Sequence, residues 1–406
     1  MVLRRGLIWV MAIGCGVAAA NLYYNQPMLV DMGRTMHASD RQMGFVVTLG
    51  QVGYGLGMLL FIPLGDLVDR KRLLVVLLVA TSVALGAAAA AMNYTWLALA
   101  SFGIGLTTVT AQVLMPLAAH LAEPSQRGRV IGSLYTGLLF GILLARTLSG
   151  FVSAHFGWRA MFALAAVGSI ALGIALWTTL PHVSHGYEPG LTYPRLIASL
   201  GRLVVREPQL REACIIGGSL FGSFSAFWTT LVFLLASPAY HYGSRAAGLF
   251  GLVGAASALI APAAGRLADR RGSRFVIASA AVVVLGSWLV FWSLGLYLWG
   301  LILGVILLDI GVQAAQVSNQ SRVLGLLQHA RGRANTVYMI GYFTGGSLGS
   351  LLATLAWSRF GWPGVCAVGA GLTVIGGLTA LHAVKSIRGA PTEPASLSPT
   401  PESVHA

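Results

Sequence analysis

Twelve apolar segments follow one another along this sequence of 406 residues, and each is long enough to cross a lipid bilayer as a helix. The hydrocarbon core of a bilayer satisfies no backbone polar group, so a chain crosses it only as helices or as a closed barrel. A spanning helix needs about 20 apolar residues. The sequence therefore predicts an all-α membrane protein with twelve transmembrane helices, expected at Leu7–Val30, Met43–Leu64, Leu73–Met92, Thr95–Ala118, Val130–Ala154, Met161–Leu180, Glu212–Ala236, Ala246–Gly265, Phe275–Leu294, Tyr297–Ser321, Ala334–Trp357 and Trp362–Val384.

A polar stretch divides the twelve segments into two groups of six. We expect residues 1–180 to form one six-helix bundle, residues 181–211 a cytoplasmic linker and residues 212–384 a second bundle. The tail, residues 385–406, is rich in Pro, Ser and Thr. Because such a composition buries too little apolar surface to fold, the tail is expected to be disordered.

The charge content excludes a soluble enzyme and a nucleic-acid-binding protein. Only 9% of the residues are charged, against about 25% in soluble domains. The net charge of +14 comes from short basic clusters between apolar segments, such as Arg70-Lys71-Arg72, and not from one basic face. The three cysteines are isolated, so they form no disulfide framework or metal-ligand spacing. No nucleotide-binding loop or catalytic motif is present, so we expect no enzyme activity, cofactor, metal or nucleic-acid partner.

The distribution of Lys and Arg predicts the orientation. Most of the 26 lie in alternate loops, in the linker and in the two ends of the chain. Cytoplasmic loops carry an excess of Lys and Arg, so both termini are expected in the cytoplasm. The exceptions are Arg34, Arg41, Arg159, Arg245 and Arg359 in the opposite loops and Arg146 inside an apolar segment.

The two halves repeat each other at a displacement of 204 positions. Ala111-Gln112-Val113 recurs as Ala315-Gln316-Val317, and Phe156-Gly157-Trp158 recurs as Phe360-Gly361-Trp362. Ladders of small residues also recur, which allow close approach of helices in lipid. They are Gly137, Gly141, Ala145 and Ser149 in the fifth segment and Gly341, Gly345, Gly349 and Ala353 in the eleventh. Several matches in one register indicate an internal duplication.

The tenth segment carries an acid in its middle. Asp309, Gln313, Gln316 and Gln320 are spaced so that one face of a helix presents them all. An ionisable group at membrane depth is costly and is usually functional. Asp309 is therefore predicted to bind and release a proton, and the glutamines to contact a substrate. The alternative is a structural acid bonded to a neighbouring helix.

Arg146 is the other charge within an apolar segment. It stays protonated, so it needs an acid, carbonyl groups or water. It could pair with Asp309, contact an anionic substrate or lock the bundles in one state. Alternatively, it could extend to the membrane surface from the outer end of its helix.

Other polar and aromatic residues are candidates for substrate binding. Asn21, Tyr24, Asn25 and Gln26 share one region of the first segment, and Pro27 is expected to kink or end that helix. Hydrogen bonds between helices are the alternative role for these groups. Further candidates are Thr108 and Gln112 in the fourth segment and Phe227 and Trp228 in the seventh, although aromatic rings in membrane helices more often serve packing.

A duplicated loop resembles a motif of the major facilitator superfamily. Gly65, Asp69 and Arg70 follow the second segment, and Gly265, Asp269 and Arg270 repeat them after the eighth. The resemblance covers Leu7 to Val384 and implies two six-helix bundles around a central path, with alternating access to a site near mid-membrane. It also implies that the two loops act as a cytoplasmic gate.

Within this family, NLYYNQP at Asn21–Pro27 and LLDIGVQAAQVSNQ at Leu307–Gln320 resemble bacterial drug and sugar efflux proteins driven by protons. Arg72 departs from the loop motif of the superfamily, which usually has glycine there, and Ala145-Arg146 departs from a Gly-Pro motif of the efflux group. The resemblance implies a monomer in the bacterial inner membrane that exports small molecules in exchange for protons. A proton symporter or facilitator that imports a metabolite is an open alternative, and a membrane receptor without transport is a more remote one.

Overall fold

The structure is a computed structural model that describes residues 5–123, 126–181, 192–258, 266–267, 270–326 and 330–388. Gly265 and Asp269 of the second gate loop lie outside the described residues, as does most of the tail. Every element in the described part of the chain is helical. In the first half these elements are α1 (Arg5–Asn21), the short 3-10 helix η1 (Gln26–Met28), α2 (Leu29–Met36), α3 (Asp40–Leu64), α4 (Arg70–Ala89), α5 (Tyr94–Thr107), α6 (Thr110–Leu121), α7 (Arg127–Phe156) and α8 (Trp158–Thr179).

The second half begins with a helix that the sequence did not predict, α9, inside the polar linker. The helices that follow give the expected six spans, because α15 contains two helices that meet at Gly361. The elements are α9 (Tyr193–Arg206), α10 (Pro208–Ala236), α11 (Ser244–Ala258), α13 (Ser273–Leu294), α14 (Leu298–Leu326) and α15 (Arg331–Arg388).

The predicted fold class is confirmed. Within the described residues, ten helical stretches are long and apolar enough to cross a membrane. One of them, Arg331–His382, contains two helices, and α11, with 15 described residues, is a further helix beside these ten stretches. Many large apolar side chains on these helices are exposed, as expected of surfaces that face lipid. The twelve expected helices are therefore all accounted for.

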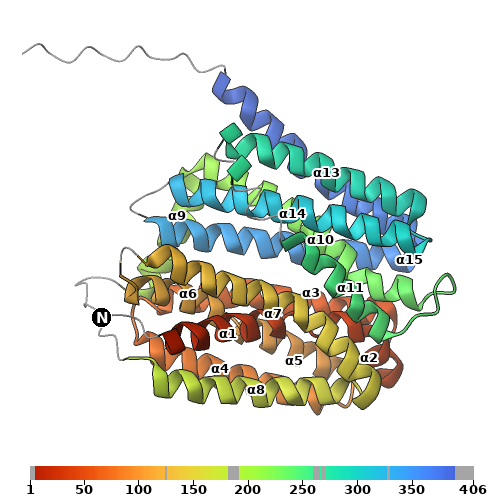
Figure 1. Cartoon of the computed structure of the whole chain (residues 1–406), viewed down its shortest axis with the longest axis horizontal. Helices are drawn as coiled ribbons and strands as arrows, with labels where there is room; N and C mark the ends of the chain where they lie inside the picture. Colours follow the sequence, from red (N-terminus) through yellow and green to blue (C-terminus); the bar gives the residue numbers. More distant parts are fainter. Residues whose placement is uncertain are drawn as a thin grey trace, which may run out of the picture.

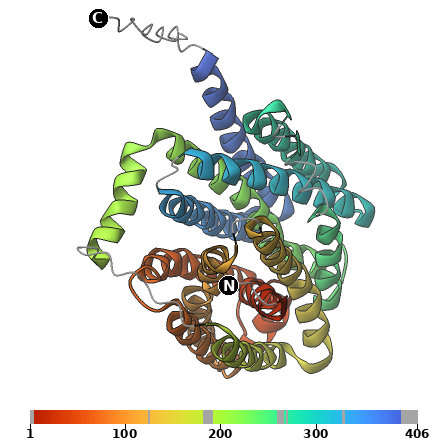
Figure 2. The same ribbon diagram turned by 60° about the vertical axis from the view of Figure 1, so that its left-hand side comes forward.

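The helices form two bundles that lie side by side. Figure 1 shows α1–α8 in the lower, red-to-yellow half and α10–α15 in the upper, green-to-blue half. The bundles contact each other mainly where α3 meets α15 and where α7 meets α11. The start of α1, the linker helix α9 and the end of α15 lie at one end of the molecule, which we call the inner end (Figures 1 and 2). The opposite end, with α2, is the outer end.

Two spans of the first half are interrupted near mid-membrane, and the interruptions meet. The first span leaves helical geometry after Asn21 and resumes through Pro27, which confirms the expected break. The fourth is broken at Thr108, between α5 and α6. The Thr108 hydroxyl donates to the Ala18 carbonyl at 2.9 Å and accepts from the Asn21 amide at 3.2 Å. The corresponding helices of the second half, α10 and α14, run without a break.

The small-residue ladders lie where helices approach most closely. A Cβ atom at Gly141 would overlap the main chain of Gly16 in α1, and one at Gly345 would overlap the main chain of Gly218 in α10. The repeat therefore builds the same contact twice, α1 against α7 and α10 against α15. The repeated Phe-Gly-Trp motif forms the turn that follows each of these helices, between α7 and α8 and between the two helices of α15. Gly157 and Gly361 both have positive φ there, which favours glycine.

Candidate functional site

A cavity of about 310 Å³ lies between the two bundles. Residues of α1, α3, α6, α7, α10, α14 and α15 line it, so both halves of the duplication contribute. Its walls combine aromatic rings and carboxamides with aliphatic side chains. The aromatic rings include Tyr23, Tyr54, Phe221, Phe224, Tyr342 and Phe343, and the carboxamides are Gln112, Gln313, Gln316, Gln320 and Asn335.

The central cavity continues toward the inner end of the molecule. A second cavity of about 540 Å³ lies there, bordered by the gate loop, α9 and the start of α15, and it shares Gln112, Pro116 and Asn335 with the central cavity. A third cavity, also about 540 Å³, lies at the outer end beside Arg34, Asp40 and Trp357 and has no lining residue in common with the central one. The central cavity therefore adjoins the cavity at the inner end and shares no lining residue with the cavity at the outer end.

Asp309 lies one helical turn from Gln313, just beyond the outer end of the central cavity. Its side chain is 4% exposed and does not line the cavity. The indole Nε1 of Trp228 donates to Asp309 Oδ1 at 3.3 Å. Gly254 of α11 faces the other carboxylate oxygen, and a Cβ atom at that position would overlap it. The carboxyl group is thus enclosed by α10, α11 and α14.

Arg146 approaches the same indole ring from the first half. Its guanidinium carbon lies 4.0 Å from the ring centroid of Trp228 and 4.9 Å from that of Tyr23. Its Nε donates to Gln26 Oε1 at 2.8 Å. In the described part of the chain, Arg146 forms no salt bridge with Asp309, and its buried Nη2 has no hydrogen-bond partner. The indole of Trp228 therefore contacts both opposite charges, with a cation–π contact at its face and a hydrogen bond at its N–H edge.

Uncharged polar bonds join the bundles beside this charged layer. Gln51 of α3 donates to the Ser225 hydroxyl of α10 at 3.3 Å and accepts from the Ser350 hydroxyl of α15 at 3.2 Å. Ser350 also lies 2.9 Å from the Thr229 hydroxyl. All four side chains are buried, and Gln51 is one turn outward of the cavity residue Tyr54. This network, which we call the Gln51 network, joins the two bundles on the outer side of the cavity.

The structure distributes the predicted substrate residues over three places. Gln112, Gln313, Gln316 and Gln320 line the central cavity. Gln26 and Trp228 belong to the charged layer, and Asn21 and Thr108 join the two helix breaks. None of these last four lines the cavity, and neither do the remaining three. Tyr24 and Asn25 are buried, and Phe227 stacks on Phe291 at a centroid distance of 4.5 Å.

The first gate loop is held by bonds within itself. The Asp69 carboxylate accepts from the backbone N–H of Arg72 and so caps the start of α4. Arg70 donates to the Gly65 carbonyl at 3.0 Å and forms an ion pair with Asp66 at 2.9 Å. In the second loop, the described residue Arg270 is exposed.

Sequence reasoning missed several residues of the site. The only sequence signal for the Gln51 network is Gln51 itself, because it is a lone carboxamide in an apolar segment. The cavity aromatics, such as Phe221 and Phe343, carry no signal that separates them from packing residues. Glu212 was assigned only as a segment boundary, although its carboxylate lies 2.7 Å from Arg322 and 3.9 Å from Arg274 at the inner end of the second bundle.

Comparison with known proteins places this architecture in a family. The family model described as Major Facilitator Superfamily matches residues 11–329. A protein of Escherichia coli strain K12 with the name "Putative uncharacterized transporter YgaY" is 39% identical over 373 residues, which are 92% of this chain and 94% of that protein. A protein of Helicobacter pylori named as a probable sugar efflux transporter is 24% identical over 86% of this chain and 87% of its own.

Solved structures agree with the family model. A crystal structure of a variant of the nucleoside transporter NupG superposes with a TM-score of 0.76 at 13% sequence identity. The superposition covers 92% of this chain and 99% of that one, so the likeness concerns the whole fold. The duplicated bundles, the central cavity and these matches lead to one conclusion: the chain belongs to the Major Facilitator Superfamily and is a secondary transporter of small molecules, not an enzyme.

Proposed function

We propose that this transporter exports small organic molecules in exchange for protons, and that Asp309 carries the proton. The observation that carries the proposal is the position of the Asp309 carboxyl group, buried directly outward of the cavity and bonded to the neutral indole of Trp228. A carboxylate in a direct ion pair would be held in its charged form. Here the partner is an uncharged donor, and Arg146 forms no salt bridge with Asp309 in the described part of the chain, so both protonation states can be accommodated.

The surroundings of Asp309 couple its charge to the packing of both bundles. Trp228 touches Asp309 of the second bundle and Arg146 of the first. Protonation of Asp309 removes the negative charge that balances Arg146 and weakens the bond from Trp228. Such a change alters the energy of the contact between α7 and the second bundle, and a contact of this kind is able to bias the two access states.

Export rather than import is supported by the relative named for sugar efflux and by the motifs shared with the drug and sugar antiporter group. In this proposal the inner end faces the cytoplasm of a bacterium, the membrane is the inner membrane and the transporter works as a monomer. The conformation in which the central cavity adjoins the inner end is then the one that takes up cargo from the cytoplasm. The cavity-lining residues Gln112, Gln313, Gln316 and Gln320 contribute to binding, and the charged-layer residues Gln26 and Trp228 contribute to coupling.

The remaining predicted residues keep more peripheral roles in the proposal. Asn21 and Thr108 hold together the helix breaks next to the cavity. Tyr24, Asn25 and Phe227 support the walls from behind. The loop from Gly65 to Arg70, and its repeat from Gly265 to Arg270, gate the inner end by bonds that differ between the two access states.

Everted membrane vesicles that contain the transporter test this function. Respiration acidifies the vesicle interior, and a pH-sensitive dye records the loss of acidity when a candidate compound is added. An exported substrate should accumulate inside and dissipate the acidity, and Asp309→Asn should abolish the coupling. Glu207→Gln, which makes the same chemical change at the start of α10, should leave it intact. Full proton-coupled transport by Asp309→Asn would refute the role of Asp309, and proton-driven efflux of the compound from these vesicles would indicate symport.

A further inference from the structure

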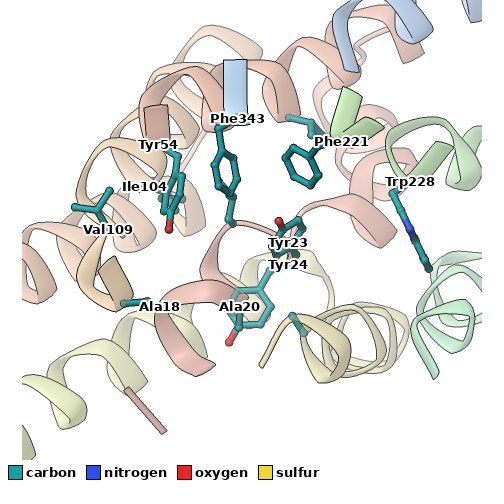
Figure 3. Packing of buried hydrophobic residues seen from close by; sticks show 14 of the residues in the cluster. Ala18, Ala20, Tyr23, Tyr24, Tyr54, Ile104, Val109, Phe221, Trp228 and Phe343 are labelled. Carbon is teal, nitrogen blue, oxygen red and sulfur yellow. The ribbon is translucent and has the colours of Figure 1, made fainter. Parts of the chain in front are cut away.

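The aromatic rings of the central cavity form a wall suited to a flat, apolar molecule. Phe221 stacks on Tyr342 with centroids 4.0 Å apart and an interplanar angle of 15°. Phe343 lies between Tyr54 and Phe221, as Figure 3 shows, at centroid distances of 4.4 and 5.1 Å. The rings of Phe221 and Tyr342 are nearly parallel, whereas the ring of Phe343 is inclined by 54° to Tyr54 and by 72° to Phe221, so the wall presents both faces and edges of rings. A planar aromatic ring forms favourable contacts of both kinds.

Carboxamides supply the polar groups of the cavity. Gln316 accepts from the Tyr338 hydroxyl at 2.6 Å, and Gln320 donates to Asn335 at 2.9 Å. Gln313 is half-buried, lines the cavity and forms no hydrogen bond with another described residue. Its side chain therefore offers one donor group and one acceptor group to a bound molecule, and neither carries a charge.

None of the described residues that line the cavity carries a formal charge. Arg146 and Asp309 lie behind the rings of Tyr23, Phe224 and Trp228, at the outer end. A charged molecule in the cavity would lose hydration without a counter-ion within hydrogen-bond reach. Aromatic faces can bind cations, but the guanidinium of Arg146 already lies over Tyr23 and Phe224 and would repel one.

From these observations we propose that the transporter is selective for uncharged, planar molecules with a hydrogen-bonding edge, and that Gln313 is the residue that recognises this edge. One consequence of this selectivity, the movement of charge across the membrane, rests on the proposed exchange of protons. If each cycle returns one proton on Asp309 and moves a neutral molecule the other way, one positive charge crosses the membrane per cycle. Transport is then driven by membrane potential as well as by a pH gradient.

Binding to the purified full chain tests the selectivity without knowledge of the natural substrate. The probes are matched sets on naphthalene, quinoline and indole rings, each as a carboxamide, a carboxylate and a trimethylammonium derivative, measured by isothermal titration calorimetry. A carboxamide should bind saturably, and its charged counterparts at least tenfold more weakly. Gln313→Ala should weaken binding about fivefold, the loss of about one hydrogen bond, whereas Gln209→Ala at the exposed inner end should not. Equal or tighter binding of the charged probes, or no saturable binding of any carboxamide, would overturn the inference.

Two further measurements separate this inference from the proposed function. Asp309→Asn should still bind the neutral probe, because Asp309 is not part of the lining. In proteoliposomes without a pH gradient, a potassium diffusion potential of the right sign should drive movement of the bound probe. If a pH gradient drives movement and the potential does not, the exchange of protons stands and the electrogenic neutral exchange is wrong. If neither drives it while the neutral probe still binds selectively, the selectivity stands and the proton exchange fails.

Discussion

Gln51→Leu tests whether the Gln51 network keeps the outer side of the cavity closed. Leucine has a similar volume and no polar group, so the change removes the bonds to Ser225 and Ser350 while it keeps the space filled. Ser350 retains its partner Thr229. Each lost bond is worth about 0.5–1.5 kcal/mol net, so the outward-closed state should lose about 2 kcal/mol.

This loss corresponds to a shift of about 30-fold in the ratio of outward-open to outward-closed molecules. A protein that spends about 1% of its time open to the outside would spend about 20% there. Spin labels at Arg41 and Arg359, exposed residues at the outer ends of α3 and α15, would report the change as a second, longer distance. The background for labelling replaces Cys15, Cys214 and Cys366, which are all free thiols.

Gln209→Leu is the matched control, because it removes a carboxamide from an exposed position at the inner end. It should leave the distance between the labels unchanged. The same single distance in Gln51→Leu as in the control, with both proteins eluting as folded species, would show that the network does not determine closure.

Three further predictions concern packing, coupling and the inner loop. Gly345→Ala should lower the melting temperature in a thermal-shift assay by about 5 °C, because a methyl group there overlaps the facing main chain and overpacking costs about 1–3 kcal/mol. Gly371→Ala on the same element meets open space and should have no such effect. Trp228→Phe removes the hydrogen bond to the Asp309 carboxyl group and should slow proton-coupled transport about tenfold. Binding of a neutral probe should stay unchanged. An unchanged transport rate in vesicles would contradict this role of Trp228. Lys71→Met should lower the free energy of unfolding, measured by chemical denaturation, by about 2 kcal/mol, because the buried ammonium group donates to a carbonyl at the end of α8 at 2.7 Å. Arg72 is exposed, so Arg72→Met should leave that free energy unchanged.

Much of the fold could be predicted because it depends on composition and spacing along the chain. Apolar segments of spanning length leave helices as the solution in lipid, and a displacement of 204 positions relates one bundle to the other. The same reasoning located Pro27 as a helix break and the glycine ladders as close contacts. The break at Thr108 was not foreseen, since no proline or glycine marks it and the cause is its bonds to another helix.

The candidate site could be predicted only in part. The glutamine face of α14 does line the cavity, because residues at helical spacing share a face whatever surrounds them. Helical spacing does not tell which neighbour a face will meet. For that reason two residues adjacent in sequence have different surroundings. Phe227 packs in an aromatic core, whereas Trp228 contacts two opposite charges.

Hydrophobicity and periodicity are local properties of the chain, so the residues alone predict a membrane protein of duplicated helices with one acid and one base inside apolar segments. The folded structure adds that the indole of Trp228 contacts both Asp309 and Arg146, that Gln51 joins the bundles and that both charges lie outside the cavity. Those relations depend on which faces of α3, α7, α10 and α14 pack together. The packing of residues more than 80 positions apart is a property of the whole fold, and the spacing of residues along one helix does not contain it.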